Sequence, residues 1–306
     1  MGRTVLSSRA LDPAPRAVAV GNFDGVHAGH RAVLAALAEV AAARGAAPVV
    51  YTFDPAPTAV VAPERHQPRI VDVADRARLL LEAGVEEVVV ERFSSAMAAH
   101  PARWFAREVL ARRLGAVAVV VGHDFRFGHG REGDAEALRG WLPGVEVLEV
   151  PAVTRDGAPI SSSRIRREVA AGAVEEAAAM LGRPHRLRGT VVPGDQRGRT
   201  LGFPTANLRL ETELLPAHGV YAVRVAVDGA GPRAAVMNLG TRPTVDGLRV
   251  VPEVHLLDFD GDLYGREVEV SLVTRVREER RFGSLEALVA QIRADVDAAR
   301  VRLASP

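Results

Sequence analysis

The sequence contains no cysteine and no lysine, and all 39 of its basic residues are arginine. Without cysteine, the chain has no disulfide, no thiolate zinc site and no cysteine nucleophile, and a cytoplasmic location is expected. Without lysine, mechanisms that use a phosphate-loop lysine or a Schiff base are excluded. No apolar run reaches the 18 residues of a membrane span and no signal peptide is recognisable, so we expect no membrane partner.

Acidic and basic residues are nearly balanced, and the formal net charge is +1. This balance argues against a surface that coats nucleic acid, so we expect no nucleic-acid partner. The preference for arginine accompanies abundant alanine, glycine and proline, which indicates biased genome composition. With 306 residues, of which 48% are hydrophobic, the chain is long enough for two globular domains.

Apolar runs and helical patterns alternate through the first part of the chain. The runs typical of strands are AVAVGNFD, PVVYTF, EEVVVERF, AVAVVVG and VEVLEVPAV. Among the helical patterns between them, ARWFAREVLARRLG at residues 102–115 predicts one continuous helix. Such alternation predicts a doubly wound, Rossmann-like parallel sheet that binds ligands at the carboxyl ends of its strands. We assign residues 1–184 to this α/β domain.

The pattern changes after Pro184, where β-type segments follow one another without helices between them. Their alternating faces and their Asp-Gly and Gly-Pro turns predict an antiparallel barrel or sandwich over residues 185–306. A terminal helix is predicted behind a Ser284 cap. Its apolar stripe consists of Leu285, Leu288, Val289, Ile292 and Val296.

The segment GNFDGVHAGH, residues 21–30, lies where the first predicted strand gives way to the first helix. A helix N-terminus offers backbone N–H groups and a positive dipole end to a phosphate, and the three glycines allow close approach of the backbone. His27 and His30 are three residues apart, so both imidazoles share a face and can point at one phosphate. The alternatives are a turn with two solvent-facing histidines, or a metal pair, for which no third ligand is evident nearby.

Two further segments are expected at the same edge of the sheet. TFDPAP, residues 52–57, ends the second strand, where Asp54 can shape a ligand wall. Residues 122–134 end the fourth strand with carboxylate, aromatic and arginine side chains at the binding edge.

The segment ISSSRIRREV, residues 160–169, places three serines before a predicted helix whose first turn holds Arg164 and Arg166. A serine cap with arginine at a helix start forms a phosphate site by the same dipole argument. The alternative is an ordinary cap with solvated arginines.

Together, these four segments resemble the adenylyltransferase half of the bacterial bifunctional riboflavin kinase/FMN adenylyltransferase family, also called FAD synthetase. His-x-Gly-His at residues 27–30 is similar to the motif of the nucleotidyltransferase superfamily, and the Gly-Asn-Phe-Asp-Gly-Val prefix makes the resemblance specific. The resemblance implies catalytic roles for His27 and His30. It implies ATP-binding roles for Gly21, Phe23, Asp24, Gly29, Ser162, Ser163, Arg164 and Arg166, and flavin-binding roles for Asp54, Asp124, Phe125 and Arg126.

A second dense motif, GTVVPGDQRGRTLGFPTANL, spans residues 189–208. Its glycines predict loops that pass close to phosphate, and Thr205 and Asn207 carry neutral oxygens suited to Mg²⁺ and a triphosphate. By composition alone it is a turn-rich barrel segment, but over ten positions it resembles the riboflavin kinase signature G-R-x-L-G-F-P-T-A-N. The resemblance implies ATP or flavin binding by Gly194, Gly198, Arg199, Gly202, Phe203 and Pro204.

Glu253, in VPEVHLLDFDGDLYG, resembles the catalytic base of the kinase family, which implies that it accepts a proton from the 5′-hydroxyl of riboflavin. By position alone, it is an outward-facing strand residue. Just beyond it, Asp258, Asp260, Asp262 and Glu269 match positions 1, 3, 5 and 12 of a calcium-binding loop. The sixth position is Leu263 rather than glycine and the flanks are strand-like, so we predict a hairpin turn instead.

The resemblance covers nearly the whole chain and implies two reactions. The barrel phosphorylates riboflavin to FMN with ATP and Mg²⁺, and the first domain joins FMN to the AMP part of a second ATP, giving FAD and pyrophosphate. The expected partners are the small molecules riboflavin, FMN and ATP. Two alternatives are a nucleotidyltransferase for another phosphorylated substrate, with the barrel as a recognition module, and a flavin-binding regulator without turnover.

Overall fold

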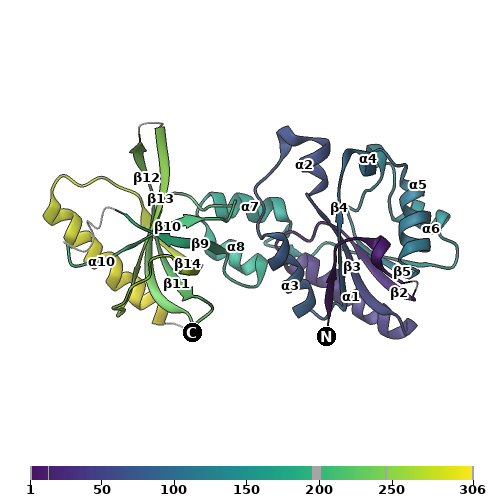
Figure 1. The fold of residues 1–306 in the computed structure, drawn as a ribbon, viewed down its shortest axis with the longest axis horizontal. Helices are drawn as coiled ribbons and strands as arrows, with labels where there is room; N and C mark the ends of the chain where they lie inside the picture. Colours follow the sequence, from purple (N-terminus) through teal and green to yellow (C-terminus); the bar gives the residue numbers. More distant parts are fainter. Residues whose placement is uncertain (1, 13, 195–200, 245–246, 305–306) are drawn as a thin grey trace. The chain divides into compact units, whose positions relative to one another are not determined.

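A computed structural model describes residues 2–12, 14–194, 201–244 and 247–304 of the chain. The chain divides into two compact units, Met1–Ser162 and Ser163–Pro306. The first is an α/β unit with a parallel sheet, and the second contains a closed antiparallel barrel and a terminal helix (Figure 1). The predicted fold class is therefore confirmed.

The first unit is built on six parallel strands in the order β1-β4-β3-β2-β5-β6. Their bounds are Arg3–Val5 (β1), Arg16–Val20 (β2), Ala47–Asp54 (β3), Glu87–Arg92 (β4), Ala116–Gly122 (β5) and Glu146–Val150 (β6). All five predicted strands are present. The edge strand β1 was not predicted, because three residues are too short to show a periodic pattern.

Helices cover both faces of this sheet (Figure 1). On one face, α1 (Ala28–Arg44) and α3 (Val73–Glu82) pack against alternate strand residues, and on the other η3 (Phe105–Arg113) and α6 (Ala135–Trp141) do so. The short elements are η1 (Ser8–Ala10), α2 (Pro57–Val61), η2 (Pro63–Arg65), α4 (Ser95–Ala98), α5 (Ala102–Trp104), η4 (His129–Arg131), β7 (Thr154–Arg155) and β8 (Ala158–Pro159). The unit is thus doubly wound.

The single helix predicted over residues 102–115 is wrong in detail. Only α5 is α-helical, and η3 continues from it as a π-helix, in which the N–H of Leu114 donates to the carbonyl of Val109, five residues back, at 3.0 Å. The wider turn buries Phe105, Ala106 and Leu110 together with Val109. An apolar pattern with spacings of four to five residues does not separate a π-helix from an α-helix, so the π-helix could not be predicted from it.

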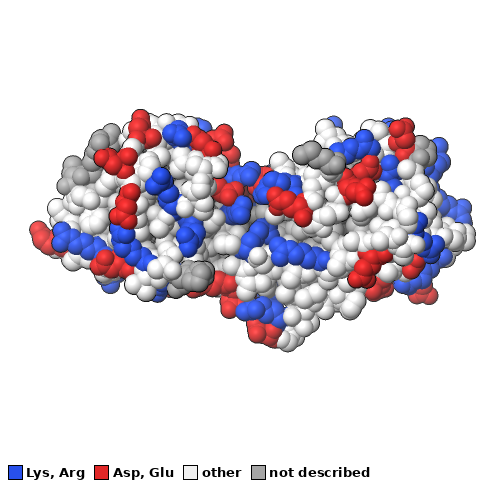
Figure 2. Space-filling model, turned by 90° about the horizontal axis from the view of Figure 1, so that it is seen from below, with Lys and Arg blue, Asp and Glu red and all other residues white. Residues whose placement is uncertain are grey.

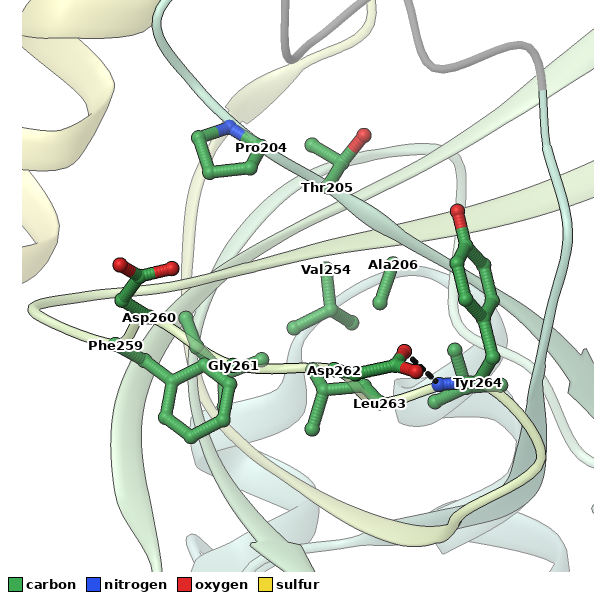
Figure 3. A pocket seen from close by; sticks show the side chains of 12 residues that line it. Pro204, Thr205, Ala206, Val254, Phe259, Asp260, Gly261, Asp262, Leu263 and Tyr264 are labelled. Atoms are coloured by element: carbon green, nitrogen blue, oxygen red, sulfur yellow. Dashed lines mark hydrogen bonds between the residues drawn. The ribbon is translucent and has the colours of Figure 1, made fainter.

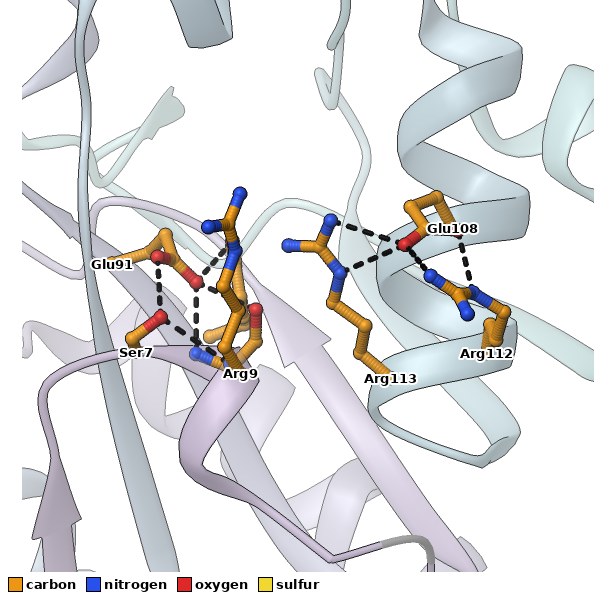
Figure 4. Close-up of polar contacts among 8 residues, drawn as sticks. Ser7, Arg9, Glu91, Glu108, Arg112 and Arg113 are labelled. Atoms are coloured by element: carbon orange, nitrogen blue, oxygen red, sulfur yellow. Dashed lines mark hydrogen bonds and ion pairs between the residues drawn. The ribbon is translucent and has the colours of Figure 1, made fainter.

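Glu91, in β4, holds the N-terminal segment on the sheet (Figure 4). Its carboxylate accepts hydrogen bonds from the Ser7 hydroxyl (3.0 Å), the Ser8 N–H (2.9 Å) and hydroxyl (2.7 Å), and the Tyr51 hydroxyl (3.2 Å). Although burial raises the pKa of Glu91, these hydrogen bonds hold it below its usual value. The other carboxylate in the view, Glu108 of η3, pairs with two arginines of the same segment.

The second unit is a closed barrel of antiparallel strands in the order β10-β13-β12-β11-β14-β9. The bounds are Arg186–Val192 (β9), Ala206–Leu210 (β10), Gly219–Val227 (β11), Arg233–Thr244 (β12), Gly247–Leu256 (β13) and Glu267–Glu278 (β14). Between the two architectures that the pattern allowed, the structure therefore selects the barrel. Alternate residues, among them Leu208, Val254 and Leu256, fill its interior.

The described residues of the second part of the chain also form the helices α7 (Ser162–Ala170), α8 (Val174–Leu181) and α10 (Leu285–Ala304). α10 packs on β11, β12 and β14. The predicted apolar stripe is partly wrong, since Leu285 is 56% exposed and the buried residues of α10 are Asp295, Ala299 and Leu303. Asp295 is buried because it pairs with Arg277 of β14 at 2.8 Å, which turns this face of the helix toward the barrel.

The described surface carries both signs of charge. Arginines and carboxylates are interspersed over the face that Figure 2 shows, as the net charge of +1 leads one to expect. Of the helices that are described, none has the length and hydropathy of a membrane span.

Candidate active sites

The segment GNFDGVHAGH lies at the switch point of the parallel sheet. β2 ends at Val20 and α1 begins at Ala28, so residues 21–27 form the loop between them. β2 pairs with β3 on one side and with β5 on the other, and the order of the strands reverses there. In doubly wound sheets, this crevice at the carboxyl ends of the strands is where ligands bind.

The backbone of this loop is strained. Phe23 (φ 51°) and Val26 (φ 43°) adopt left-handed conformations, as does Gly25 (φ 86°). For residues with a side chain, such a conformation costs on the order of 1 kcal/mol or more, and it persists where surrounding contacts enforce it. Strain of this kind is concentrated at functional sites.

Side chains from other parts of the first unit hold the loop in place. The buried carboxylate of Asp24 accepts the backbone N–H of Ile70 at 3.1 Å, and the Ser162 hydroxyl donates to the Asp24 carbonyl at 2.9 Å. The Thr52 hydroxyl donates to the carbonyl of Asn22 at 3.1 Å. These contacts place Asp24 in the support of the loop, and its predicted contact with ATP stays a prediction.

The two histidines of the segment lie face to face. Their rings stack with centroids 3.6 Å apart and an interplanar angle of 17°, and the ring of Phe23 lies 5.1 Å from that of His30. His27 caps α1, since its Nδ1 accepts the N–H of His30 at 3.3 Å. A neutral His27 therefore carries its proton on Nε2. Gly29 packs against this ring, because a Cβ there would lie 3.1 Å from Cε1 of His27.

His30 has an unusual electrostatic environment. Burial, His27 and Arg76 together hold the pKa of His30 well below the ordinary value of 6.5, in that order of importance. Its Nδ1 is buried and has no hydrogen-bond partner among the described residues. Since a buried polar atom without a partner is costly, it is a candidate for contact with a bound ligand.

Arg76 of α3 belongs to this site, and no sequence motif predicted it there. It is 4% exposed and donates to the carbonyls of Asn22 (3.0 Å) and Phe53 (2.7 Å), which follow β2 and end β3. Burial lowers the pKa of Arg76, and the charges of Asp24 and Asp54 oppose this effect. The one available signal was its spacing, because Arg76 shares the buried face of α3 with Leu80, four residues later.

The predicted flavin-binding residues lie at the carboxyl ends of β3 and β5. Asp54 ends β3 and pairs with Arg69 at 3.6 Å. Asp124, Phe125 and Arg126 follow β5, and Arg126 pairs with Asp134 at 3.4 Å. Aromatic rings gather at the same edge, where Phe125 lies 5.2 Å from Phe127 and Phe53 lies 5.4 Å from Phe93. No sequence pattern predicted the Phe53–Phe93 pair, because Phe53 belongs to β3 and Phe93 follows β4, 40 residues later in the chain.

The predicted serine cap of α7 is shifted. Ser162 and Ser163 are the first two residues of the helix rather than residues before it. Ser162 belongs to the first unit and is tied to the loop through Asp24, whereas Ser163, Arg164 and Arg166 belong to the second unit. The approach of these last three residues to the histidine pair stays a prediction.

The second motif leads into the barrel. Gly194 precedes residues 195–200, and the predicted site residues Gly198 and Arg199 lie outside the described residues. The described part resumes at Leu201, Gly202 adopts a φ of 84°, and Phe203 and Pro204 lead to Thr205 and β10.

Cross-strand pairing brings two predicted site residues together. Asn207 of β10 lies directly opposite Glu253 of β13, on the outer face of the barrel, because Leu208 and Val254 point inward. Asn207 also lies against Gly194, where a Cβ would be 2.0 Å from its amide nitrogen. The structure thus confirms that Glu253 faces outward and places it beside Asn207 of the GFPTAN motif.

The inner side of the same strands lines a cavity of ≈ 540 Å³ (Figure 3). Pro204, Thr205 and Val254 line one part of it, and residues 259–264 line another. The predicted hairpin turn at this segment is wrong, because β13 and β14 do not pair and the connection between them runs along the cavity. In the described chain, no cluster of three or more His, Asp or Glu side chains could hold a metal ion.

The fold and these motifs define a class of enzyme that combines a nucleotidyltransferase-like unit with a flavokinase-like barrel. Residues 10–164 match the FAD synthetase family and residues 181–303 match the riboflavin kinase family. A bifunctional riboflavin kinase/FMN adenylyltransferase of Escherichia coli strain K12 is 42% identical over 92% of this chain and 90% of its own length. One of Pseudomonas fluorescens is 42% identical over 94% of this chain and 92% of its own.

A solved structure from Streptococcus pneumoniae, titled a macrolide-efflux protein, has a TM-score of 0.89 and 35% sequence identity, and 98% of each chain is covered. Together with the matches above, it shows that the architecture is shared. The chain belongs to the family of bifunctional riboflavin kinase/FMN adenylyltransferases.

Proposed function

We propose that this chain carries out two consecutive reactions of flavin cofactor synthesis, each with ATP. The barrel phosphorylates riboflavin to FMN, and the parallel-sheet unit adenylylates FMN to FAD with release of pyrophosphate. The observation that carries the proposal is the presence of both family motifs on their matching folds: the histidine pair at the switch point of the sheet and the Asn207–Glu253 pair on the barrel. Family membership over 92% of the chain supports it.

In the adenylyl transfer, an oxygen of the FMN phosphate attacks the α-phosphorus of ATP, and the bond from that phosphorus to the bridging oxygen of pyrophosphate breaks. His27 and His30 donate hydrogen bonds to the phosphoryl oxygens as charge accumulates on them. The lowered pKa of His30 supports this role, because a neutral imidazole keeps its geometry and protonation state at neutral pH. The buried Arg76 adds positive charge beside the pair.

Residues of the loop and of α7 are assigned to the rest of the nucleotide. Gly21, Phe23, Asp24 and Gly29 shape the phosphate end of the site, and Ser162, Ser163, Arg164 and Arg166 hold the β- and γ-phosphates that leave. Asp54, Asp124, Phe125 and Arg126 contact the flavin. Their positions at strand ends and at a helix start support these roles.

In the barrel, Glu253 accepts the proton of the riboflavin 5′-hydroxyl as that oxygen attacks the γ-phosphorus of ATP. The bond from that phosphorus to the β–γ bridging oxygen breaks, and ADP leaves. Thr205 and Asn207 are assigned to Mg²⁺. Asn207 lies beside Glu253, and the neutral oxygens of Thr205 and Asn207 suit a hard cation that enters with the nucleotide and keeps most of its other ligands. When bound, the ion neutralises phosphate charge. Gly194, Gly198, Arg199, Gly202, Phe203 and Pro204 surround the ATP and flavin.

The proposal is tested by incubating the protein with riboflavin, ATP and Mg²⁺ and separating riboflavin, FMN and FAD by chromatography. Wild type should form both FMN and FAD and release pyrophosphate. His30→Ala should abolish FAD formation and still form FMN, and Glu253→Ala should form no FMN yet convert supplied FMN to FAD. Loss of FMN formation in His30→Ala, or failure of Glu253→Ala to convert supplied FMN to FAD, contradicts the assignment of one reaction to each unit, and absence of turnover in wild type favours a regulator.

A further inference from the structure

His255 of β13 supports the GFPTAN segment from the outside of the barrel. It follows Glu253 by two residues, and the intervening Val254 points inward, so both side chains lie on the outer face. Its Nδ1 lies 2.7 Å from the carbonyl oxygen of Pro204. Its ring also meets that of Phe203 edge to face, with centroids 5.8 Å apart and an interplanar angle of 81°. One side chain thus contacts two consecutive residues of the motif.

The chemistry of this contact fixes the position of the proton on His255. A carbonyl oxygen only accepts hydrogen bonds, so Nδ1 is the donor and carries the proton. The Pro204 carbonyl belongs to the peptide group that joins Pro204 to Thr205. Because that peptide group is planar, holding its oxygen in place also fixes the positions of the N and Cα atoms of Thr205. Thr205 lines the cavity and is the residue assigned to the magnesium-bound nucleotide.

We infer that His255 is a positioning residue of the phosphotransfer site. It touches neither ATP nor riboflavin, and it acts by holding the Pro204–Thr205 peptide where the Thr205 hydroxyl can meet the nucleotide. The inference rests on the proposed kinase function. In the segment that begins at Leu201, strand pairing with β13 starts at Ala206, which pairs with Val254, so the contact of His255 holds the residues before that point.

Two substitutions separate this role from ordinary packing. In His255→Asn, the side-chain amide nitrogen lies near the place of Nδ1 and can donate to the Pro204 carbonyl. In His255→Gln, the amide reaches the place of Nε2, so the donor is lost although polarity and size are similar. Loss of one hydrogen bond corresponds to roughly a tenfold change in binding.

The test is steady-state riboflavin phosphorylation with varied ATP. His255→Gln should raise the KM for ATP roughly tenfold while kcat changes less, and His255→Asn should stay within about twofold of wild type. FAD formation from supplied FMN should be unchanged in both variants, because that reaction is assigned to the other unit. Equal impairment of the Asn and Gln variants, or a Gln variant that behaves as wild type, would overturn the inference.

A second measurement does not depend on turnover. In protein labelled with ¹⁵N at histidine, the chemical shifts of the His255 ring nitrogens report which of them carries the proton. A protonated Nδ1 supports the inference, whereas a proton on Nε2 alone overturns it. If wild type forms no FMN, the proposed function fails, and this measurement still decides whether His255 anchors the segment.

Discussion

At the scale of single residues, the most informative side chain is His30. Its pKa is lowered in the folded protein from an ordinary value of 6.5, so the unfolded chain binds more protons than the folded one once the pH falls below that value. The folded state therefore has its full stability above about pH 6.5 and loses some of it as the pH falls toward the lowered pKa. We expect the first unit to lose at most about 1.4 kcal/mol per pH unit from this source.

Urea denaturation of wild type and His30→Gln between pH 5 and 8 measures this effect, because the glutamine variant lacks the titrating group. Its stability should fall less steeply below pH 6.5 than that of wild type. His123→Gln, which changes an exposed histidine after β5, should keep the slope of wild type. If the slopes of wild type and His30→Gln coincide, the pKa of His30 is not lowered by folding.

Adding a single Cβ atom at Gly194 tests whether the position of the Asn207 side chain matters for the barrel site. A Cβ on this residue would lie 2.0 Å from the amide nitrogen of Asn207, so Gly194→Ala must displace the amide that lies beside Glu253. We expect riboflavin phosphorylation to fall roughly tenfold or more, as for a misplaced positioning group, and FAD formation from FMN to be unchanged. Gly231→Ala is the control, since a Cβ there meets nothing within 4 Å, and it should leave both rates as in wild type.

At the scale of elements, α3 and the β2–α1 loop form one support for the histidine pair. Asp24 accepts the N–H groups of Ile70 and Val71 just before α3, and Arg76 of α3 donates back to the Asn22 carbonyl. The two elements therefore hold each other from both sides. The loop contains non-glycine residues in the left-handed conformation, which is strained. We therefore expect its backbone to relax when one of these hydrogen bonds is removed.

Arg76→Gln should therefore lower FAD formation by about tenfold or more, since it removes the charged hydrogen bonds to the carbonyls of Asn22 and Phe53. It should also raise the pKa of His30, because the positive charge of Arg76 now lowers it. The rate of FAD formation against pH and the rate of FMN formation are the measurements. Arg78→Gln, two residues along α3, removes an exposed arginine paired with Asp75 and Glu82 and should change neither rate. If Arg76→Gln forms FAD as fast as Arg78→Gln does, the hydrogen bonds of Arg76 are not needed for this reaction.

At the scale of the whole molecule, local patterns predicted the architecture and the motifs, and contacts between distant segments escaped them. The alternation of strands and helices follows from hydrophobic period, which a single chain displays directly. By contrast, Arg76 and Asn22 are 54 residues apart, and an arginine in a helix is ordinarily solvated. The pairing of Asn207 with Glu253 depends on barrel register, which no local pattern encodes.

The sequence pattern and the structure place the boundary between the two units at different residues. The sequence places it after Pro184, whereas contacts divide the chain after Ser162, which assigns α8 to the barrel unit. Val174 of α8 is fully buried in the barrel core, and the Thr274 hydroxyl of β14 donates to Glu175. Burial of one valine stabilises a fold by about 2 kcal/mol, which is a large part of the stability of a small domain.

We therefore expect a fragment of residues 173–306 to phosphorylate riboflavin and to resist urea better than a fragment of residues 185–306, by about 2 kcal/mol or more. The cut before Ala173 falls at Gly172, in the turn between α7 and α8, so it removes no residue of α8. Val174→Ala in the longer fragment should lie between the two in stability, because it removes part of the same buried surface. Equal stability and activity of the two fragments would establish the boundary at 184/185 and make α8 a connection between the functions.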